Sequence, residues 1–319
     1  MGDPAPAALD TFLRRAARSA AAATEAEAVV RADAVTQVLG ELGLGADPAE
    51  RLRLFAGAAD LCPKVTLEVA GYDVEARLTP AELWRFYLPL CQAIRQVGHR
   101  AGRRILVGVG GPGASGKSVL ALLLIELLNR WPDAAARRAA LCTLDGFHFP
   151  NSYLDSHFTT DAAGRRVPLR AVKGSPDSFD AASFVAALRR LRSEPAVSLP
   201  RYDRRLHDPV PDGHPVGPED GIVLVEGNYL LLDRDHWADV AGLLDLCLFI
   251  SLPMEAAREA MVPRFVRGGR PAEEARRRYD AVDRANYEVI VSTMPRADLV
   301  IRRDARQRII AIERPAGAV

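Results

Sequence analysis

A short glycine-rich segment, G-P-G-A-S-G-K-S at residues 111–118, carries the clearest chemical signal in this sequence. It follows the apolar run I-L-V-G-V at 105–109 and precedes a helical pattern at 119–125. Glycines let such a loop turn tightly with its N–H groups pointing inward, where an anion meets them together with the positive end of the next helix. The lysine then reaches the outer phosphates of a nucleotide, and the serine hydroxyl sits on Mg²⁺. The predicted phosphate-binding residues are Gly111, Gly113, Ala114, Ser115, Gly116, Lys117 and Ser118.

Two carboxylates follow other apolar runs. Asp145 comes after the run at 139–144 and Glu226 after the run at 222–225. A kinase must position an acceptor hydroxyl and accept its proton, which Asp145 can do. Glu226 stands where a Walker-B-type carboxylate meets Mg²⁺, directly or through water. Each alone could be a turn residue or a strand terminus, but with the glycine-rich loop they predict a nucleotide kinase with Lys117 and Asp145 in catalysis and Ser118 and Glu226 at the metal.

Two basic segments are further candidates. Arg264, Arg267 and Arg270 lie in a glycine-bearing stretch between two helical patterns, which predicts a lid at about 258–292. Arginines on such a flap can close over the phosphates and exclude water, so Arg264 and Arg267 are predicted to bind the nucleotide. A second cluster, at 165–173, could grip an anion or form a solvated face, and its position alone does not decide between these.

The elements that must position these residues alternate along the chain. Short continuous apolar runs at 139–144, 222–225, 246–250 and 299–301 are typical of strands buried on both faces. Helical patterns separate them, notably at 181–191 and 272–290. This order predicts an α/β fold with a mostly parallel, doubly covered sheet and a site at the carboxyl ends of its strands.

The first third of the chain precedes this alternation. We expect an N-terminal helical extension at 1–102, with a small hairpin at 65–78, followed by a kinase domain at 103–319. Thr79, Pro80 and Glu82 form the pattern of a capping box that opens a helix. The function of this extension is not readable from its sequence.

Composition excludes several classes of protein. Lys and Arg number 42 against 41 Asp and Glu, a formal net charge of +1, so no overall field favours nucleic acid or an anionic membrane. No apolar stretch reaches the roughly 18 residues that span a bilayer, and no export signal opens the chain. The four cysteines lie far apart and indicate neither a disulfide framework nor a metal site. We expect a cytoplasmic enzyme.

Residues 88–312 resemble the phosphoribulokinase/uridine kinase/type I pantothenate kinase group of P-loop kinases. The motifs D-G-F-H-F-P-N-S at 145–152 and K-G-S-P-D-S-F-D at 173–180 are similar to a run in type I pantothenate kinases. There the Asp is the base and the Lys contacts nucleotide phosphates, which implies those roles for Asp145 and Lys173. The segment E-G-N-Y-L-L-L-D at 226–233 is closest to a branch of sugar, or fructose-transport-associated, kinases.

The same resemblance implies contacts with the phosphate acceptor. Pro200, Tyr202 and His207 match an element of uridine kinases in which the Tyr and His touch the acceptor. Arg204 stands where the pantothenate kinases have a His, which favours a hydroxyl-rich or anionic acceptor because a guanidinium supplies several donors and a fixed charge. The resemblance also implies ATP and Mg²⁺ and suggests a homodimer. The candidate acceptor contacts are His148, Tyr202, Arg204, His207 and Asn286.

Two classes of function fit these residues. The leading one is an ATP- and Mg²⁺-dependent kinase acting on a hydroxyl of a small metabolite such as a sugar, a nucleoside or a pantothenate-like compound. The alternative is a P-loop regulatory NTPase that acts through a protein partner. The chain lacks the N-K-x-D element that reads guanine, which argues against a familiar GTPase.

Overall fold

The centre of the protein is a six-stranded sheet. The computed structural model describes residues 33–45, 47–69, 72–130, 137–161 and 164–316. The strand order is β12-β11-β10-β3-β9-β4, and every pairing is parallel except the one between β11 and β12. All residues of β3 are buried, as the continuous apolar runs predict for strands covered on both faces. The strands are β3 (Ile105–Gly110), β4 (Arg138–Thr143), β9 (Asp220–Glu226), β10 (Leu246–Ser251), β11 (Leu299–Arg303) and β12 (Ile309–Glu313).

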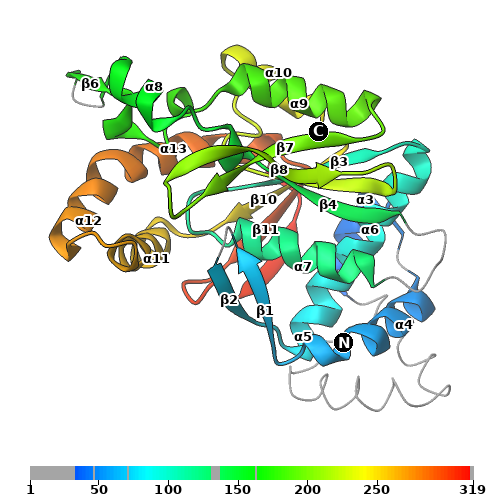
Figure 1. Ribbon diagram of the computed structural model, residues 1–319. Helices are drawn as coiled ribbons and strands as arrows, with labels where there is room; N and C mark the ends of the chain where they lie inside the picture. The colour runs from blue at the N-terminus through cyan, green and yellow to red at the C-terminus, as the bar shows by residue number, and fades with distance from the viewer. Residues whose placement is uncertain (1–32, 46, 70–71, 131–136, 162–163, 317–319) are drawn as a thin grey trace.

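Helices cover both faces of this sheet, which confirms the predicted fold class. In Figure 1, α6 and α7 lie below the sheet and α9 and α10 above it. Leu120 and Leu124 of α7 share a hydrophobic core with Val107 of β3. Phe184 of α9 shares a second core with Val223 of β9. The covering helices are α6 (Leu88–Ala101), α7 (Lys117–Asn129), α9 (Ala181–Ser193) and α10 (Ala238–Ala241).

The segment before the sheet packs onto its lower face. Val35 and Leu39 of α3 belong to the same core as Leu120, so this segment is not a separate body. The predicted hairpin is present as the antiparallel pair β1 and β2, and the Thr79–Glu82 capping box is formed. The helices predicted before residue 33 lie outside the described residues. The elements are α3 (Ala34–Glu41), α4 (Pro48–Ala58), η1 (Ala59–Leu61), β1 (Lys64–Val69), β2 (Tyr72–Arg77), α5 (Pro80–Glu82) and the π-helical turn η2 (Leu83–Tyr87).

Short elements follow β4 and form one side of the site. The hairpin of β7 and β8 packs against η3, the turn that carries Asp145. A Cβ at Gly146 would collide with the Pro200 carbonyl oxygen, so this close approach requires a glycine. The elements are η3 (Leu144–Phe147), α8 (Asn151–Ser156), β5 (Phe158–Thr160), β6 (Arg166–Pro168), η4 (Leu169–Val172), η5 (Pro176–Ser178), β7 (Val197–Asp203) and β8 (Asp208–Val216).

The segment predicted as a lid is helical, but one part of that prediction is wrong. Arg264 and Arg267 lie in the last turn of α11 rather than in a loop. The glycines at 268 and 269 end the helix, and a helix C-terminus favours positive side chains. Only Arg270 lies in the turn, where it pairs with Glu274. The elements of this segment are α11 (Met254–Arg267), α12 (Ala272–Arg278), the π-helical turn η7 (Tyr279–Asp283) and α13 (Arg284–Ser292). Two short helical turns lie outside it, η6 (Asp235–Trp237) and η8 (Met294–Arg296).

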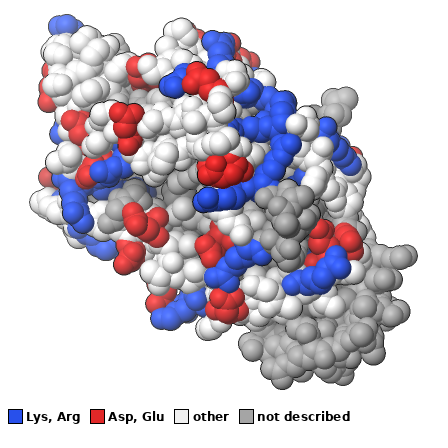
Figure 2. Space-filling view, turned by 45° about the vertical axis from the view of Figure 1, so that its right-hand side comes forward, with Lys and Arg blue, Asp and Glu red and all other residues white. Residues whose placement is uncertain are grey.

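The surface carries charges of both signs. Figure 2 shows Lys and Arg lying beside Asp and Glu on the face it presents. Among the described residues, no helix combines the length and apolarity that a membrane span requires.

Candidate active site

The glycine-rich loop joins β3 to α7 at the carboxyl end of the sheet. Gly111 and Gly116 have φ angles of 139° and 85°, a backbone region that favours glycine. A Cβ at Gly111 would stand 2.6 Å from the Ile250 carbonyl oxygen. The Ser115 hydroxyl is buried, and no hydrogen-bond partner is found for it among the described residues. A tightly curled backbone and a buried hydroxyl without a partner fit a bound polyphosphate.

Lys117 and Ser118 point from the start of α7 toward the end of β9. The Ser118 hydroxyl donates to Glu226 Oε2 at 3.2 Å, and Lys117 Nζ donates to the Pro112 carbonyl at 2.9 Å. Lys117 Nζ also lies 3.9 Å from Glu226 Oε1. Burial lowers the pKa of Lys117, and the negative charges of Glu226 and Asp145 oppose that shift. The hydroxyl and carboxylate oxygens of Ser118 and Glu226 are ligands that Mg²⁺ prefers, so this pair fits the metal.

Asp145 follows β4, which is separated from the loop strand β3 by β9. Glu226 therefore lies between the loop and Asp145. Burial raises the pKa of Glu226, Lys117 lowers it, and the charge of Asp145 raises it further. The two carboxylates are thus close enough to repel each other. The charge of Asp145 also raises the pKa of Lys117, so the two side chains lie in the same region, and the catalytic role of Asp145 stays a prediction.

His148 and Tyr202 form a wall beside Asp145. The His148 ring packs on Phe179, with 3.8 Å between ring centroids, and lies 5.3 Å from the Tyr202 ring. His148 Nδ1 is 3.0 Å from the Asp145 carbonyl oxygen. Burial lowers the pKa of His148, against the raising effect of Asp145, so its imidazole is neutral at pH 7. Both rings are therefore placed to border an acceptor next to Asp145.

Lys173 lies on this acceptor side. Its Nζ donates to Asn151 Oδ1 and to the His207 carbonyl, each at 2.8 Å, and stands 5.1 Å from the Tyr202 ring centroid. Burial lowers the pKa of Lys173 to about 8, and Arg170 contributes to the shift. These contacts are with acceptor-side residues rather than with the glycine-rich loop, so the phosphate contact implied for Lys173 stays a prediction.

Three predicted acceptor residues remain: Arg204 lies in the turn between β7 and β8, and His207 and Asn286 lie near Lys173 or the loop that carries it. His207 has a φ of 53° in the turn between β7 and β8, and its carbonyl, not its exposed ring, holds Lys173. Asn286 lies on α13, where its Nδ2 is 3.9 Å from the position of a Cβ at Gly174. Asn286 thus borders the loop that carries Lys173.

Arg264 reaches the site from α11. Burial lowers its pKa, the nearby Arg204 lowers it further, and Asp145 and Glu226 oppose the shift. The Arg264 side chain is exposed to solvent, but nearby protein atoms remove part of its hydration, and this loss lowers its pKa. Arg267 is also exposed, and its charge contributes least to the pKa shift of Arg264. Of the two predicted lid arginines, Arg264 is thus the one brought to the carboxylates.

The loop, the strand-end carboxylates and their order in the sheet point to one family of proteins. A sequence model of the Phosphoribulokinase / Uridine kinase family matches residues 106–310. The chain belongs to this family. It is therefore a P-loop kinase that uses ATP and Mg²⁺ to phosphorylate a small molecule.

Individual relatives agree with this assignment. The chain is 33% identical over 242 residues to "Uncharacterized protein YggC" of Escherichia coli K12, covering 75% of this chain and 94% of the relative. It is 28% identical to a pantothenate kinase of Rhizobium etli, over 62% of this chain and 65% of that one. A crystal structure described as a "putative fructose transport system kinase" from Silicibacter sp. TM1040 matches with a TM-score of 0.56 and 30% identity, over 64% of this chain and 93% of that chain.

Three residues that the sequence did not indicate touch the phosphate-binding loop of this kinase. A Cβ at Gly113 would collide with Met261 of α11, and one at Gly116 would collide with the buried guanidinium of Arg303. Gln307 Nε2 donates to the Ala114 carbonyl at 3.1 Å. The loop is thus enclosed by α11 and by the end of β11. No local pattern signals these contacts, since Gln307 and Ala114 are 193 residues apart.

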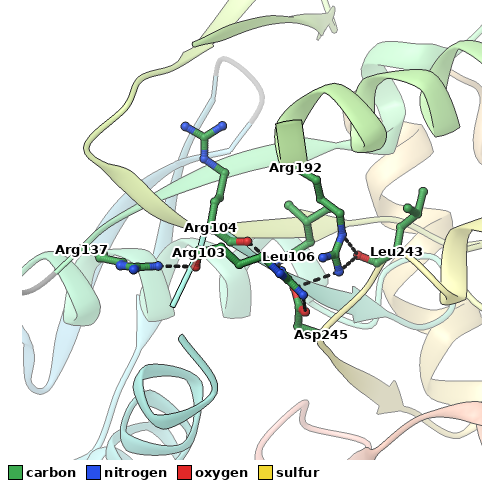
Figure 3. A network of polar contacts seen from close by, with 7 residues as sticks. All are labelled: Arg103, Arg104, Leu106, Arg137, Arg192, Leu243 and Asp245. Atoms are coloured by element: carbon green, nitrogen blue, oxygen red, sulfur yellow. Dashed lines mark hydrogen bonds and ion pairs between the residues drawn. The ribbon is translucent and has the colours of Figure 1, made fainter. Parts of the chain in front are cut away.

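A cavity of about 440 Å³ opens at the opposite, amino end of the strands. Figure 3 shows Arg103, Arg137 and Arg192 in contact with protein groups there. Arg103 pairs with Asp245 Oδ1 at 2.7 Å, and Arg192 donates to the Leu243 carbonyl at 2.6 Å. Arg104 donates to five backbone carbonyls. Ligands of parallel α/β sheets bind at the carboxyl ends of the strands, so this kinase has its site at the other end.

Proposed function

We propose that this kinase transfers the γ-phosphoryl group of ATP to a hydroxyl group of a small metabolite, with Asp145 as the base. The observation that carries the proposal is the position of Asp145 between two sets of residues. On one side its charge acts on Lys117 and Glu226. On the other side it acts on Tyr202, whose pKa burial raises to about 12 with a further contribution from Asp145. A carboxylate between a phosphate site and an acceptor site is placed to accept a hydroxyl proton.

In the proposed reaction, the acceptor hydroxyl oxygen attacks the γ-phosphorus and its proton passes to the Asp145 carboxylate. The bond from the γ-phosphorus to the bridging oxygen breaks, and ADP leaves. Lys117 and Arg264 neutralise charge on the transferred group, and Met261 helps to keep water away from the loop. Ser118 and Glu226 would hold Mg²⁺, which would supply positive charge during the transfer.

The acceptor class is supported by the wall beside Asp145 and by the relatives. His148, Tyr202 and Lys173 offer polar groups and an aromatic surface, a combination that suits a polyhydroxylated metabolite. The relatives carry the names of pantothenate, uridine and fructose transport kinases, which all denote small hydroxyl compounds or their handling. We therefore propose a sugar, nucleoside or pantothenate-like acceptor.

The test combines ATP binding with an acceptor screen. Isothermal titration should show ATP binding with Mg²⁺, and a panel of sugars, nucleosides and pantothenate should give ADP release with at least one acceptor. If no panel member reacts, a mass-spectrometric screen of a metabolite extract for compounds that gain a phosphate finds the acceptor. ADP release that needs no acceptor would instead favour the regulatory NTPase.

Replacing the base tests its role. Asp145→Asn should lower kcat by about 10²–10⁴-fold while ATP affinity stays nearly unchanged, because the amide cannot accept the proton. Asp155→Asn is the matched control, since it removes an exposed carboxylate whose charge also acts on Lys173. Turnover of Asp145→Asn equal to that of the control would remove the base assignment.

A further inference from the structure

The last residue of β11 is a buried arginine. Arg303 is only 7% exposed, and its Nε is buried without a hydrogen-bond partner. Among the described residues, its guanidinium makes neither a hydrogen bond nor an ion pair. The preceding residue differs, since Arg302 pairs with Glu313 at 2.6 Å. A buried charge without a partner costs free energy, so the position of Arg303 calls for an explanation.

The guanidinium of Arg303 packs against the phosphate-binding loop. A Cβ at Gly116 would collide with its Nη1 and would stand 3.1 Å from its Cζ. Gly116 is the N-cap residue of α7, and a glycine offers no side chain to the first N–H groups of that helix. Those N–H groups form the positive end of the helix dipole. The charge of Arg303 thus adds to positive charge that the loop already carries.

The carboxylates that follow Arg303 in the chain are held by other arginines. Asp304, the next residue, pairs with Arg308 at 2.6 Å, and Glu313 of β12 is taken up by Arg302. A guanidinium stays protonated at ordinary pH, so Arg303 cannot lose its charge as a buried lysine can. Within the part of the chain that the structure describes, the charge of Arg303 therefore has no negative counterpart.

A second residue after β11 contacts the same loop without bringing a charge. Gln307 Nε2 donates to the Ala114 carbonyl at 3.1 Å. Ala114 has a φ of 60°, a conformation that favours glycine, and this hydrogen bond helps to hold it. Gln307 therefore supports the shape of the loop, whereas Arg303 contributes charge. The two residues can be compared because they approach the loop from the same end of β11.

We propose that the phosphate groups of the bound nucleotide balance the charge of Arg303, and that Arg303 thereby favours ATP over nucleotides with less negative charge. A charge inside a protein is screened less than one at the surface, so a guanidinium behind the loop can attract a polyphosphate strongly. Because it packs on the Gly116 backbone, Arg303 is a positioning residue rather than a catalytic one. The inference concerns nucleotide binding alone and does not depend on the acceptor or on the base.

The first experiment is isothermal titration of wild type and Arg303→Met, which removes the charge and keeps a long side chain. The ligands are MgATP, MgADP and adenosine, in order of decreasing negative charge. In Arg303→Met the Kd of MgATP should rise by about tenfold, the Kd of MgADP should rise less, and the Kd of adenosine should stay unchanged. The attraction of a charge grows with the charge of the ligand, so this order is specific to an electrostatic role.

Three further variants separate charge from contact. Arg303→Lys keeps the charge and should keep the Kd of MgATP within about threefold of wild type. Arg302→Met removes the neighbouring charge, which is 43% exposed and paired, and should leave all three Kd values unchanged. Gln307→Ala removes a loop contact without a charge, so it should weaken MgATP and MgADP equally. The same equal weakening in Arg303→Met, or no rescue by Arg303→Lys, would overturn the inference.

Thermal unfolding gives an independent measurement. Without nucleotide, Arg303→Met should melt at the same temperature as wild type or higher, because an uncompensated buried charge is removed. Saturating MgATP should raise the melting temperature less in Arg303→Met than in wild type. If Arg303→Met does not fold, Arg303→Gln is measured in the same way, since it keeps a polar group without the charge. If neither neutral variant folds and Arg303→Lys does, the inference is wrong, because the charge then has a partner in the unliganded protein.

Discussion

At the amino end of the sheet, Arg104 donates hydrogen bonds to five backbone carbonyls, whereas at the carboxyl end Arg204 and Arg264 have no hydrogen-bond partner among the described residues. The same contrast holds for carboxylates. Asp245 accepts hydrogen bonds from Arg103 and from the Leu106 N–H. At the other end, Glu226 accepts a hydrogen bond from Ser118 at 3.2 Å and lies 3.9 Å from Lys117, but it is also repelled by Asp145.

The side chains at the amino end stabilise the fold, whereas those at the carboxyl end are available to bind a ligand. Burial raises the pKa of Asp245, but the hydrogen bonds from Arg103 and Leu106, together with the charges of Arg192 and Arg103, outweigh it and the net shift is downward. For Glu226 burial dominates and the net shift is upward. A charged group whose partners outweigh the cost of burial gains from folding. Glu226 keeps only Ser118 and the more distant Lys117, which do not outweigh its burial, and such a group persists where function requires it.

The largest expected effect on activity comes from a substitution at the carboxyl end of the sheet. Lys117→Met should lower kcat/KM by about 10²–10³-fold, because a positioned positive charge on the transferred group is lost. The free energy of unfolding should change by less than about 1 kcal/mol, because the burial cost of Lys117 disappears with its attraction to Glu226. Glu226, whose pKa burial already raises, can then take up a proton instead of staying charged. Steady-state kinetics and a melting curve on the same preparation check both parts. Full activity, or a collapse of stability, would contradict the comparison.

Arg104 should show the reverse behaviour. Arg104→Met leaves five carbonyls without their donor and should cost about 2 kcal/mol of unfolding free energy, moderated by water that can enter the cavity. Activity per folded molecule should stay the same. Arg138→Gln is the control from the same end, because Arg138 is exposed and its closest carboxylate oxygen is 3.6 Å away. It should change stability by less than about 0.5 kcal/mol. Urea denaturation distinguishes the two variants.

The parts of this architecture that depend on neighbouring residues were predictable from the sequence. The spacing of residues 111–118 identifies the phosphate-binding loop, and continuous apolar runs identify the buried strands. Thr79 and Glu82 predict the N-terminus of a helix, because both halves of the capping box lie within one turn. Glu226 was found because parallel strands bring their carboxyl ends to one edge.

The rest depends on contacts between distant segments. Gly146 lets the β7–β8 hairpin approach the Asp145 turn, a role that no local pattern signals. Met261 and Gln307 reach the loop from α11 and from the turn after β11, which no periodicity reveals. Whether an arginine has a partner is equally a tertiary property: the sequence at Arg104 and at Arg204 gives no sign of the difference.

A smaller effect should appear in the pH dependence of acceptor binding. The pKa of Lys173 falls from its ordinary 10.5 to about 8, mainly through burial. kcat/KM should fall above pH 8, because Lys173, which borders the proposed acceptor site, loses its charge there. Lys173→Arg should remove this alkaline limb below pH 10, because a guanidinium stays protonated. An unchanged limb in that variant would assign it to another group.

The same titration has the opposite sign for stability. Between about pH 8 and 10.5 the unfolded chain holds a proton on Lys173 that the folded chain has released, so this group makes the protein more stable as pH rises. Stability measured across this window in wild type and Lys173→Arg should therefore diverge, with the gain confined to wild type. As the pH rises above about 8, activity would then fall while stability increases. This is expected of a charged side chain at the carboxyl end of the sheet, whose charge serves function and costs stability.

The smallest expected effect comes from a single partner of Asp245. Arg103 is 45% exposed, and Asp245 also has the Leu106 N–H at 2.9 Å and Arg192 at 3.1 Å. Arg103→Gln should therefore cost only about 0.5–1 kcal/mol, because the buried carboxylate keeps two partners and an exposed ion pair contributes little. Arg103→Gln combined with Arg192→Gln should cost more than the sum of the single changes, since Asp245 then loses both positive charges. Additive losses in urea denaturation would mean that the arginines at this end act independently, and the contrast with the unpartnered arginines at the carboxyl end would then rest on Arg104 alone.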